Sequence, residues 1–302
     1  IEGGIRFDMG KVTGSFAGSS QSAIDINNDG IISAPETSVS SINTANTTAV
    51  NYDYNYVSYS VGANYALNNS QSFFARYSKG ASAKADRVLF ERPAASYLNG
   101  DLINSLDYLA QAELGYKHKF SRGYVYGTFF YAKTDEQSGF EATNPSMLTQ
   151  NNYKSLGLEV ESAYNVSNKV DLRGSFTYTK AEITSGSNAG NAPRRQPKFM
   201  YNLIPSYKFS KTNSAGLSFM GQTQAFAQDS NQLVMNGFVL INGFVELGIT
   251  KGLSLNISGN NLLDTLAITE VEEGSITENT VNYVRARPFP GRSISMALSY
   301  KF

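Results

Sequence analysis

Apolar and polar residues alternate with a period of two along most of this chain. Near the C-terminus, Ile294, Met296 and Leu298 are each separated by a small or polar residue. The same alternation recurs around Leu114, Leu203 and in the stretch 239–250. Because successive side chains of a β-strand point to opposite faces, this pattern predicts strands with one apolar and one polar face.

The alternation predicts about twelve strands. Many of them exceed the roughly 9–11 residues that cross a bilayer at a tilt. We expect strands at residues 3–17, 48–66, 71–82, 104–120, 123–136, 150–165, 169–183, 196–210, 213–228, 234–250, 252–265 and 282–302.

The connections between these strands alternate in length. Short ones fall at residues 67–70, 121–123, 166–168, 210–212 and 251–252, and long ones at 18–47, 83–103, 137–149, 183–195 and 266–281. Short turns on one side and long loops on the other are typical of bacterial outer-membrane barrels, whereas a soluble sandwich has strands of about 5–6 residues. The pattern therefore predicts an all-β fold, a transmembrane antiparallel up-and-down β-barrel. An even number of strands places both chain ends on one side.

The composition agrees with this class. The chain has 19 Tyr, 18 Phe and 26 Gly, and only 17% of its residues are charged, which suits strands and turns. No apolar run reaches the roughly 18 residues of a membrane helix. Aromatic residues recur beside the short turns, where they predict an interfacial girdle rather than scattered strand-forming rings: Tyr65, Tyr116, Phe120, Tyr124, Tyr164, Tyr207, Phe209 and Tyr300. His118, the single histidine, is expected in the same band.

Charge and residue counts exclude several classes of function. With 25 basic and 25 acidic residues the net charge is zero, so no nucleic-acid partner is expected. The absence of Cys excludes disulfides, thiolate metal sites and cysteine nucleophiles. We find no nucleophile–base pair and expect no enzyme.

Five basic residues lie in loops or at strand ends. They either meet an anionic ligand or lipopolysaccharide phosphates, or they are plain solvated loop charges, the interpretation that we favour: Arg194, Arg195, Lys198, Arg285 and Arg287.

Two motifs near the C-terminus resemble those of a known family. The stretch 257–264, Ile-Ser-Gly-Asn-Asn-Leu-Leu-Asp, is similar to the penultimate barrel strand of TonB-dependent outer-membrane receptors. Pro290-Gly291-Arg292 and the alternating strand that ends at Phe302 resemble the closing strand of the same family. We interpret these motif residues as structural.

The resemblance implies that residues 1–302 are the C-terminal part of a 22-stranded barrel in the bacterial outer membrane. It also implies an N-terminal plug domain outside this sequence and contact with TonB through that missing region. Outer-membrane lipid and lipopolysaccharide would surround the barrel. The function implied is import of a small nutrient ligand, whether an iron chelate, an oligosaccharide or a peptide. Two alternatives stay open: a passive porin-like channel, and a structural or adhesive outer-membrane protein.

The first long connection contains a calcium-loop pattern. Residues 25–36 fit D-x-[DN]-x-[DN]-G-x5-E at every defined position. Calcium takes about six to eight oxygen ligands, and the flanks lack helical periodicity, so we expect a free-standing loop stiffened by one structural ion. The predicted ligands are Asp25, Asn27, Asp29, Ile31, Ser33 and Glu36.

Overall fold

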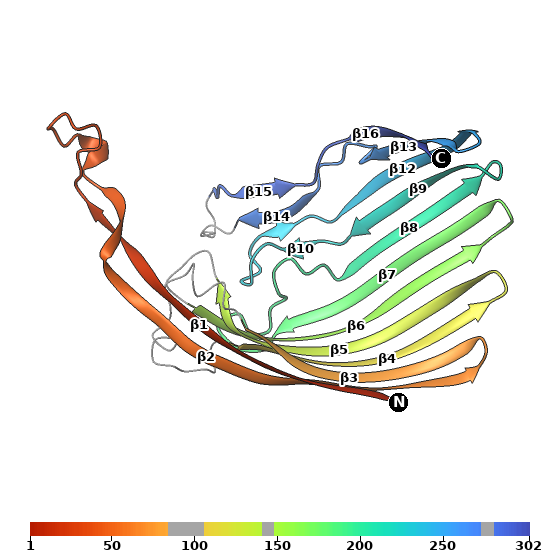
Figure 1. Cartoon of the computed structure of the whole chain (residues 1–302), viewed down its shortest axis with the longest axis horizontal. Helices are drawn as coiled ribbons and strands as arrows, with labels where there is room; N and C mark the ends of the chain where they lie inside the picture. Colours follow the sequence, from red (N-terminus) through yellow and green to blue (C-terminus); the bar gives the residue numbers. More distant parts are fainter. Residues whose placement is uncertain (84–105, 141–147, 273–280) are drawn as a thin grey trace.

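Twelve antiparallel strands form one curved sheet in the computed structural model, which describes residues 1–83, 106–140, 148–272 and 281–302 (Figure 1). Each strand pairs with its neighbours in chain order, apart from short excursions between β9 and β12 and between β13 and β16. The strands are β1 (Glu2–Ser22), β2 (Val39–Asn68), β3 (Gln71–Ala83), β4 (Leu106–Phe120), β5 (Gly123–Phe140), β6 (Leu148–Asn165), β7 (Val170–Ile183), β8 (Phe199–Lys208), β9 (Asn213–Gln222), β12 (Phe238–Thr250), β13 (Leu253–Asn260) and β16 (Ser293–Tyr300).

The excursions form two small hairpins. One pairs β10 (Ala225–Phe226) with β11 (Val234–Met235), and the other pairs β14 (Ile268–Glu272) with β15 (Arg285–Pro288). A single turn of 3-10 helix, η1, covers Ala34–Glu36. Within the described ranges, no helix is long and apolar enough to cross a membrane.

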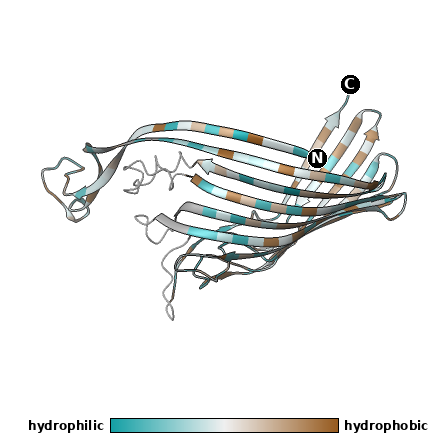
Figure 2. Ribbon diagram, turned by 90° about the horizontal axis from the view of Figure 1, so that it is seen from below, coloured by the Kyte–Doolittle hydropathy of each residue, from teal (hydrophilic) through white to brown (hydrophobic). Residues whose placement is uncertain are grey.

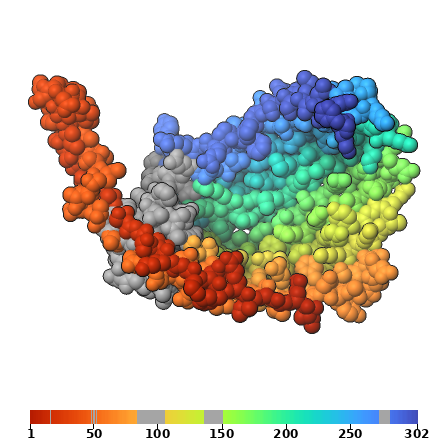
Figure 3. All heavy atoms as spheres, in the orientation of Figure 1, coloured from red at the N-terminus to blue at the C-terminus, as the bar shows by residue number. Residues whose placement is uncertain are grey.

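The sheet is an open trough. Its edge strands are β1 and β16, which are not paired with each other, and both chain ends lie at the short-turn end of the trough (Figures 1 and 3). The predicted antiparallel meander is therefore confirmed, whereas these twelve strands by themselves do not close into a barrel.

The two faces of the sheet differ in polarity, as Figure 2 shows by the alternating colours along each strand. Leu114, Phe129 and Leu158 lie directly opposite one another on β4, β5 and β6 and are 58%, 50% and 40% exposed. Their chain neighbours on the other face include Glu113 and Glu159. A continuous exposed apolar face of this kind is the lipid-contacting band of an outer-membrane barrel, so we call it the outer wall and the polar face the inner wall.

The predicted aromatic girdle is confirmed on the outer wall except at Tyr124, which was wrong: its position opposite Ala163 turns it to the inner wall, where its hydroxyl donates a hydrogen bond to Glu161. The Phe73 and Tyr116 rings lie 4.8 Å apart, and Tyr116, His118, Phe120 and Tyr164 continue the chain of ring contacts at 6.1, 5.6 and 5.9 Å between centroids. These rings stand beside the short turns. The single histidine belongs to this band, as the sequence predicts.

The first hairpin is longer than the alternation predicts. β1 pairs with β2 from Glu2 opposite Gly62 to Ser22 opposite Val39, but β3 pairs with β2 only from Tyr59 onward. The rest of the hairpin projects beyond the sheet (Figures 1 and 3). The predicted loop 18–47 was therefore wrong outside its tip. A two-stranded ribbon in water buries neither face, so its sequence carries no alternation.

Three other predicted strands are interrupted. Residues 213–228, 234–250 and 282–302 each break into a sheet strand and a piece of a small hairpin. The predicted long connection at 83–103 lies almost wholly outside the described residues. Those at 137–149 and 266–281 are described in part, and there the prediction was wrong, because 137–140 and 148–149 continue β5 and β6 and 268–272 form β14.

Candidate functional site

The tip of the projecting hairpin is a tight loop built from the predicted calcium ligands. Asp25 accepts hydrogen bonds from the backbone N–H groups of Asp29 and Gly30 at 3.2 and 2.7 Å. Asp29 accepts the Ile31 N–H at 2.8 Å and the Asn27 side-chain amide at 2.9 Å. Gly30 has a φ of 82°, which glycine adopts without strain. Gly30 thus provides the sharp turn that the calcium-loop pattern requires at its glycine.

Glu36 ties the end of this loop to its beginning. Its carboxylate accepts the Ser33 hydroxyl and N–H at 2.6 and 2.8 Å and the Ile26 N–H at 3.0 Å. The side chain is buried, and the hydrogen bonds from Ser33 lower the pKa of Glu36 to about 2. Hydrogen bonding to a charged carboxylate favours its ionised form. Glu36 is therefore an anion at the centre of the tip.

The six predicted ligand residues share this loop, but their carboxylates face the backbone. Across the described ranges, no three His, Cys, Asp or Glu side chains gather into a metal-binding group. The donor types are still those that calcium prefers, because Asp25, Asn27, Asp29, Ser33 and Glu36 all carry side-chain oxygens.

The inner wall is polar and partly charged. A hollow of about 790 Å³ lies against it, and its lining includes Lys117, Glu159, Glu161 and Arg173. Glu161 accepts a hydrogen bond from the Tyr124 hydroxyl at 2.9 Å. Polar and charged side chains of this kind suit an aqueous interior rather than a packed core.

An apolar cluster joins the loops at the long-loop end of the sheet. Ala225, Ala227, Met235 and Val271 are buried against one another, with Leu233 and Ile268 packed beside them. Together with the segment that links β7 to β8, the two small hairpins form a rim. No sequence pattern predicts this rim, because its members come from distant short segments.

Arginines hold the rim together. Arg195 forms an ion pair with Glu270 at 2.9 Å and donates to the Val271 carbonyl at 3.3 Å, and Arg287 pairs with the same Glu270. Arg194 lies 3.9 Å from the buried carboxylate of Asp229.

These contacts correct the expectation of plain solvated loop charge for Arg194, Arg195 and Arg287. Each has an acidic partner within the rim, because the loops fold onto one another instead of extending into solvent.

The two C-terminal motifs meet as a latch between β13 and β16. Asn261 is fully buried; it accepts the Thr265 N–H at 2.8 Å and donates to the Thr265 and Pro290 carbonyls at 3.0 and 3.1 Å. Asp264 accepts the Arg292 N–H at 2.8 Å. The structural interpretation of these motif residues is confirmed.

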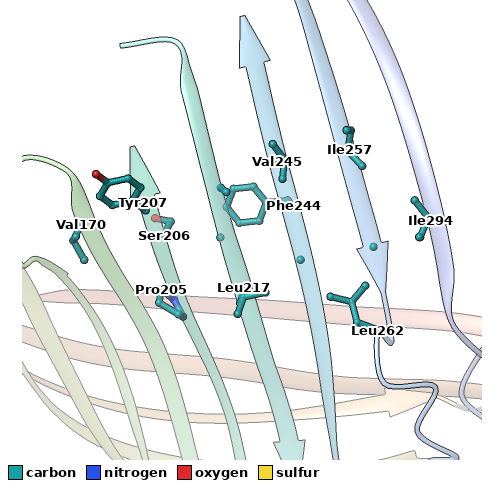
Figure 4. A pocket seen from close by; sticks show the side chains of 14 residues that line it. Val170, Pro205, Ser206, Tyr207, Leu217, Phe244, Val245, Ile257, Leu262 and Ile294 are labelled. Atoms are coloured by element: carbon teal, nitrogen blue, oxygen red, sulfur yellow. The ribbon is translucent and has the colours of Figure 1, made fainter. Parts of the chain in front are cut away.

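A groove of about 580 Å³ lies on the outer wall beside the latch (Figure 4). Leu217, Val245, Ile257 and Ile294 line it, and all belong to the outward rows of the sheet. The Leu262 side chain covers Gly259: a Cβ atom added at Gly259 would stand 2.5 Å from the Cδ2 atom of Leu262. This groove lies on the lipid-facing outer wall, so it is separate from the polar hollow along the inner wall.

Comparison with protein families decides what this sheet belongs to. The family model described as TonB dependent receptor-like, beta-barrel matches residues 2–262. The chain belongs to this family. Its members are outer-membrane receptors and transporters rather than enzymes, which places the sheet in the bacterial outer membrane. The family resemblance inferred from the motifs is confirmed.

A curated relative and several solved structures agree with the family. The ferrichrome outer membrane transporter/phage receptor of Escherichia coli (strain K12) is 27% identical over 119 residues, covering 36% of this chain and 16% of that protein. The ferric-catecholate import receptor Fiu from K12 E. coli has a TM-score of 0.69 at 16% identity, covering 99% of this chain and 42% of its own. The ferric yersiniabactin uptake receptor FyuA from Yersinia pestis has a TM-score of 0.70 at 14% identity, with the same coverage.

The chain spans only part of each of these relatives. It covers 16% of the ferrichrome transporter and 42% of Fiu and FyuA. At these identities the solved structures establish the fold alone.

Proposed function

We propose that this chain is part of a TonB-dependent receptor that imports a small nutrient ligand, an iron chelate, across the outer membrane. The observation that carries the proposal is the family match over residues 2–262 on a sheet with an apolar outer wall and a polar inner wall. The curated relative and most of the similar solved structures are receptors or transporters named for ferric chelates or siderophores. One similar structure is a copper transporter. An oligosaccharide or a peptide is the alternative cargo.

The barrel of the whole receptor would be larger than this sheet. Both edge strands, β1 and β16, offer unpaired backbone groups. Such groups cannot stay bare in lipid, because no water is present there to satisfy them. Further strands that complete a 22-stranded barrel, with a plug domain inside it that contacts TonB, would remove both edges.

Uptake of ferric chelates tests the transport proposal. We compare uptake of radioactive iron as hydroxamate, catecholate and citrate chelates in a wild-type strain, a deletion strain, a deletion strain carrying the full-length gene and a strain without TonB. Import predicts that uptake of one chelate falls equally in the deletion and TonB-less strains and returns with the gene. Uptake that survives loss of TonB contradicts the proposal and favours a passive channel. If the deletion changes the uptake of none of the three chelates, the assignment of an iron chelate is contradicted.

We also propose that the tip loop binds one structural calcium ion. Support comes from the complete calcium-loop pattern and from the ionised Glu36, which holds the two ends of the loop together. Within residues 1–83 and the other described ranges, the projecting part of the hairpin pairs only with itself, and an isolated two-stranded ribbon is marginally stable in water. An ion at the tip would stiffen it.

Calorimetric titration of the full-length protein tests this site. Binding of millimolar calcium, a concentration in the range of weak extracellular sites, should give a heat of binding with the wild type. The Asp25→Ala variant should give none. Asp53→Ala removes an exposed acid from the same hairpin outside the loop and should leave the heat unchanged. No heat with the wild type, or equal heat with Asp25→Ala, rejects the site.

A further inference from the structure

A row of lysines crosses the outer wall near the long-loop end of the sheet. Lys79 on β3 lies opposite Ala110 on β4, Ala110 lies opposite Lys133 on β5, and Lys133 lies opposite Lys154 on β6. Lys180 on β7 lies opposite Leu156, two residues below Lys154. Directly opposite residues share a face of a sheet, so all four amines stand on the outer wall.

The row lies at the upper limit of the apolar band. Along β4, the outward positions from Phe120 in the girdle to Ala110 in the row span about 33 Å of strand. At a tilt of about 40° this becomes a height of roughly 25 Å, which is the height of the apolar band of an outer-membrane barrel. The outward residues between these limits include Leu114 and Phe129. The amines therefore stand at the depth of the lipid headgroups on the long-loop side.

These lysines are poorly neutralised by the protein. Lys154 pairs with Glu182 at 3.2 Å, but within the described ranges no ion pair is recorded for Lys79, Lys133 or Lys180, which are exposed. Lys133 and Lys154 form a directly opposed like-charge pair, which is destabilising on a sheet. Such a pair is expected to attract an anion from outside the chain.

Carboxylates on the same face are fewer than the amines. Glu182 is engaged by Lys154, and Asp135 stands on the outer wall two residues above Lys133. The four lysines thus outnumber these two acids, and the described residues of this sector carry a net positive charge.

Among the described residues, the lysine cluster does not continue onto the later strands of the sheet. Among the outward positions of strands β8, β9, β12, β13 and β16 there is no Lys or Arg at all. A ring of cations that merely anchors a barrel in any bilayer would surround the wall, whereas this cluster spans adjacent strands from β3 to β7.

We propose that Lys79, Lys133, Lys154 and Lys180 bind the phosphate groups of one lipopolysaccharide molecule in the outer leaflet. Adjacent strands are about 4.8 Å apart, so the row from Lys79 to Lys154 is roughly 14 Å wide. Lysine is a point-charge binder of phosphate, and the apolar residues below the row receive the acyl chains. The site depends on the outer-membrane placement of the barrel and not on what the receptor imports.

Native mass spectrometry of the full-length protein with purified lipopolysaccharide tests the site. The variant is the triple substitution Lys79→Gln, Lys133→Gln, Lys154→Gln. The matched control, Lys169→Gln, Lys211→Gln, Lys251→Gln, removes the same charge from the short turns. Each lysine at an anionic membrane surface contributes roughly fivefold to affinity, so the variant should bind about a hundredfold more weakly. The control should bind like the wild type.

Two further arms keep the result decisive. Dephosphorylated lipopolysaccharide should lose binding to the wild-type protein, which tests the phosphate contact without any substitution. The triple substitution of the same lysines by Arg should retain binding. Undiminished binding of the Gln variant or of the dephosphorylated ligand overturns the proposal, as does equally tight binding of phosphatidylglycerol. Iron uptake is a separate readout that the Gln variant should leave unchanged, so failure here is distinguishable from failure of the import proposal.

Discussion

The latch around Asn261 provides a prediction whose size follows from the structure. Replacing Asn261 by Gly removes three hydrogen bonds of a fully buried side chain, two to Thr265 and one to Pro290. Each such bond contributes about 1 kcal/mol net, so the three together contribute about 3 kcal/mol. Gly is the suitable substitute because Asn261 has a φ of 47°, a region that other side chains rarely adopt.

The matched control is the neighbouring Asn260→Gly. Asn260 is exposed, and its side chain makes one long hydrogen bond of 3.4 Å to the Ser293 hydroxyl. Both variants increase the freedom of the unfolded chain in the same way, so the difference between them isolates the latch. The assay is urea unfolding of the full-length protein in lipid vesicles, followed by tyrosine fluorescence and analysed by linear extrapolation.

We expect Asn261→Gly to lower the free energy of unfolding by about 3 kcal/mol more than Asn260→Gly does. Such a difference changes the folding equilibrium more than a hundredfold. Equal destabilisation by the two variants would show that the hydrogen bonds between the motifs do not hold the last two strands together, and the structural interpretation of the motif would fail.

Three other predictions concern the walls, the tip and the rim. Phe129→Arg places a charge in the apolar band and should cost about 2–4 kcal/mol in vesicle unfolding, whereas Thr128→Arg, one residue away on the inner wall, should cost within about 0.5 kcal/mol of zero; equal costs would refute the assignment of the two walls. Because the pKa of Glu36 is lowered to about 2, its stabilisation of the tip is complete above the ordinary value of 4.5 and is lost as pH falls toward 2. The protection of tip amides from hydrogen exchange, relative to their intrinsic exchange rates at each pH, should fall over that range in the wild type but not in Glu36→Gln, and constant wild-type protection would contradict the role of this carboxylate. Arg195→Ala removes the ion pair with Glu270 and should speed hydrogen exchange in β14 and β15 by about tenfold, while unchanged exchange would show that the rim does not depend on it.

The twelve sheet strands were predictable because lipid and water, on opposite faces of the sheet, impose the alternation of apolar and polar residues. Lipid on one face and water on the other force alternation along every strand that crosses the membrane, as at Leu114 and Glu113. The short turns and the aromatic girdle follow from the same boundary. Sequence reasoning therefore succeeded wherever the membrane decides which residue faces which solvent.

Outside the membrane this constraint is absent, and prediction failed there. In the projecting part of the first hairpin, the described strands have no neighbour besides each other, and Val39 to Thr47 carry no alternation. The rim depends on contacts between residues far apart in the chain, such as Asn151 and Asp229 at 3.4 Å. The tip loop was recognised because a metal-binding pattern is local, whereas its hydrogen-bond geometry was not predictable.

Depth-dependent quenching along β5 tests the central claim most directly. The 302 residues contain no Cys, so a single introduced Cys carries a fluorophore at one known place in this part of the protein. Labels at Phe129→Cys and Tyr131→Cys should be quenched by brominated lipids, and labels at Thr128→Cys and Ala132→Cys should not. Quenching without alternation between neighbouring positions would contradict a sheet with lipid on one wall and water on the other.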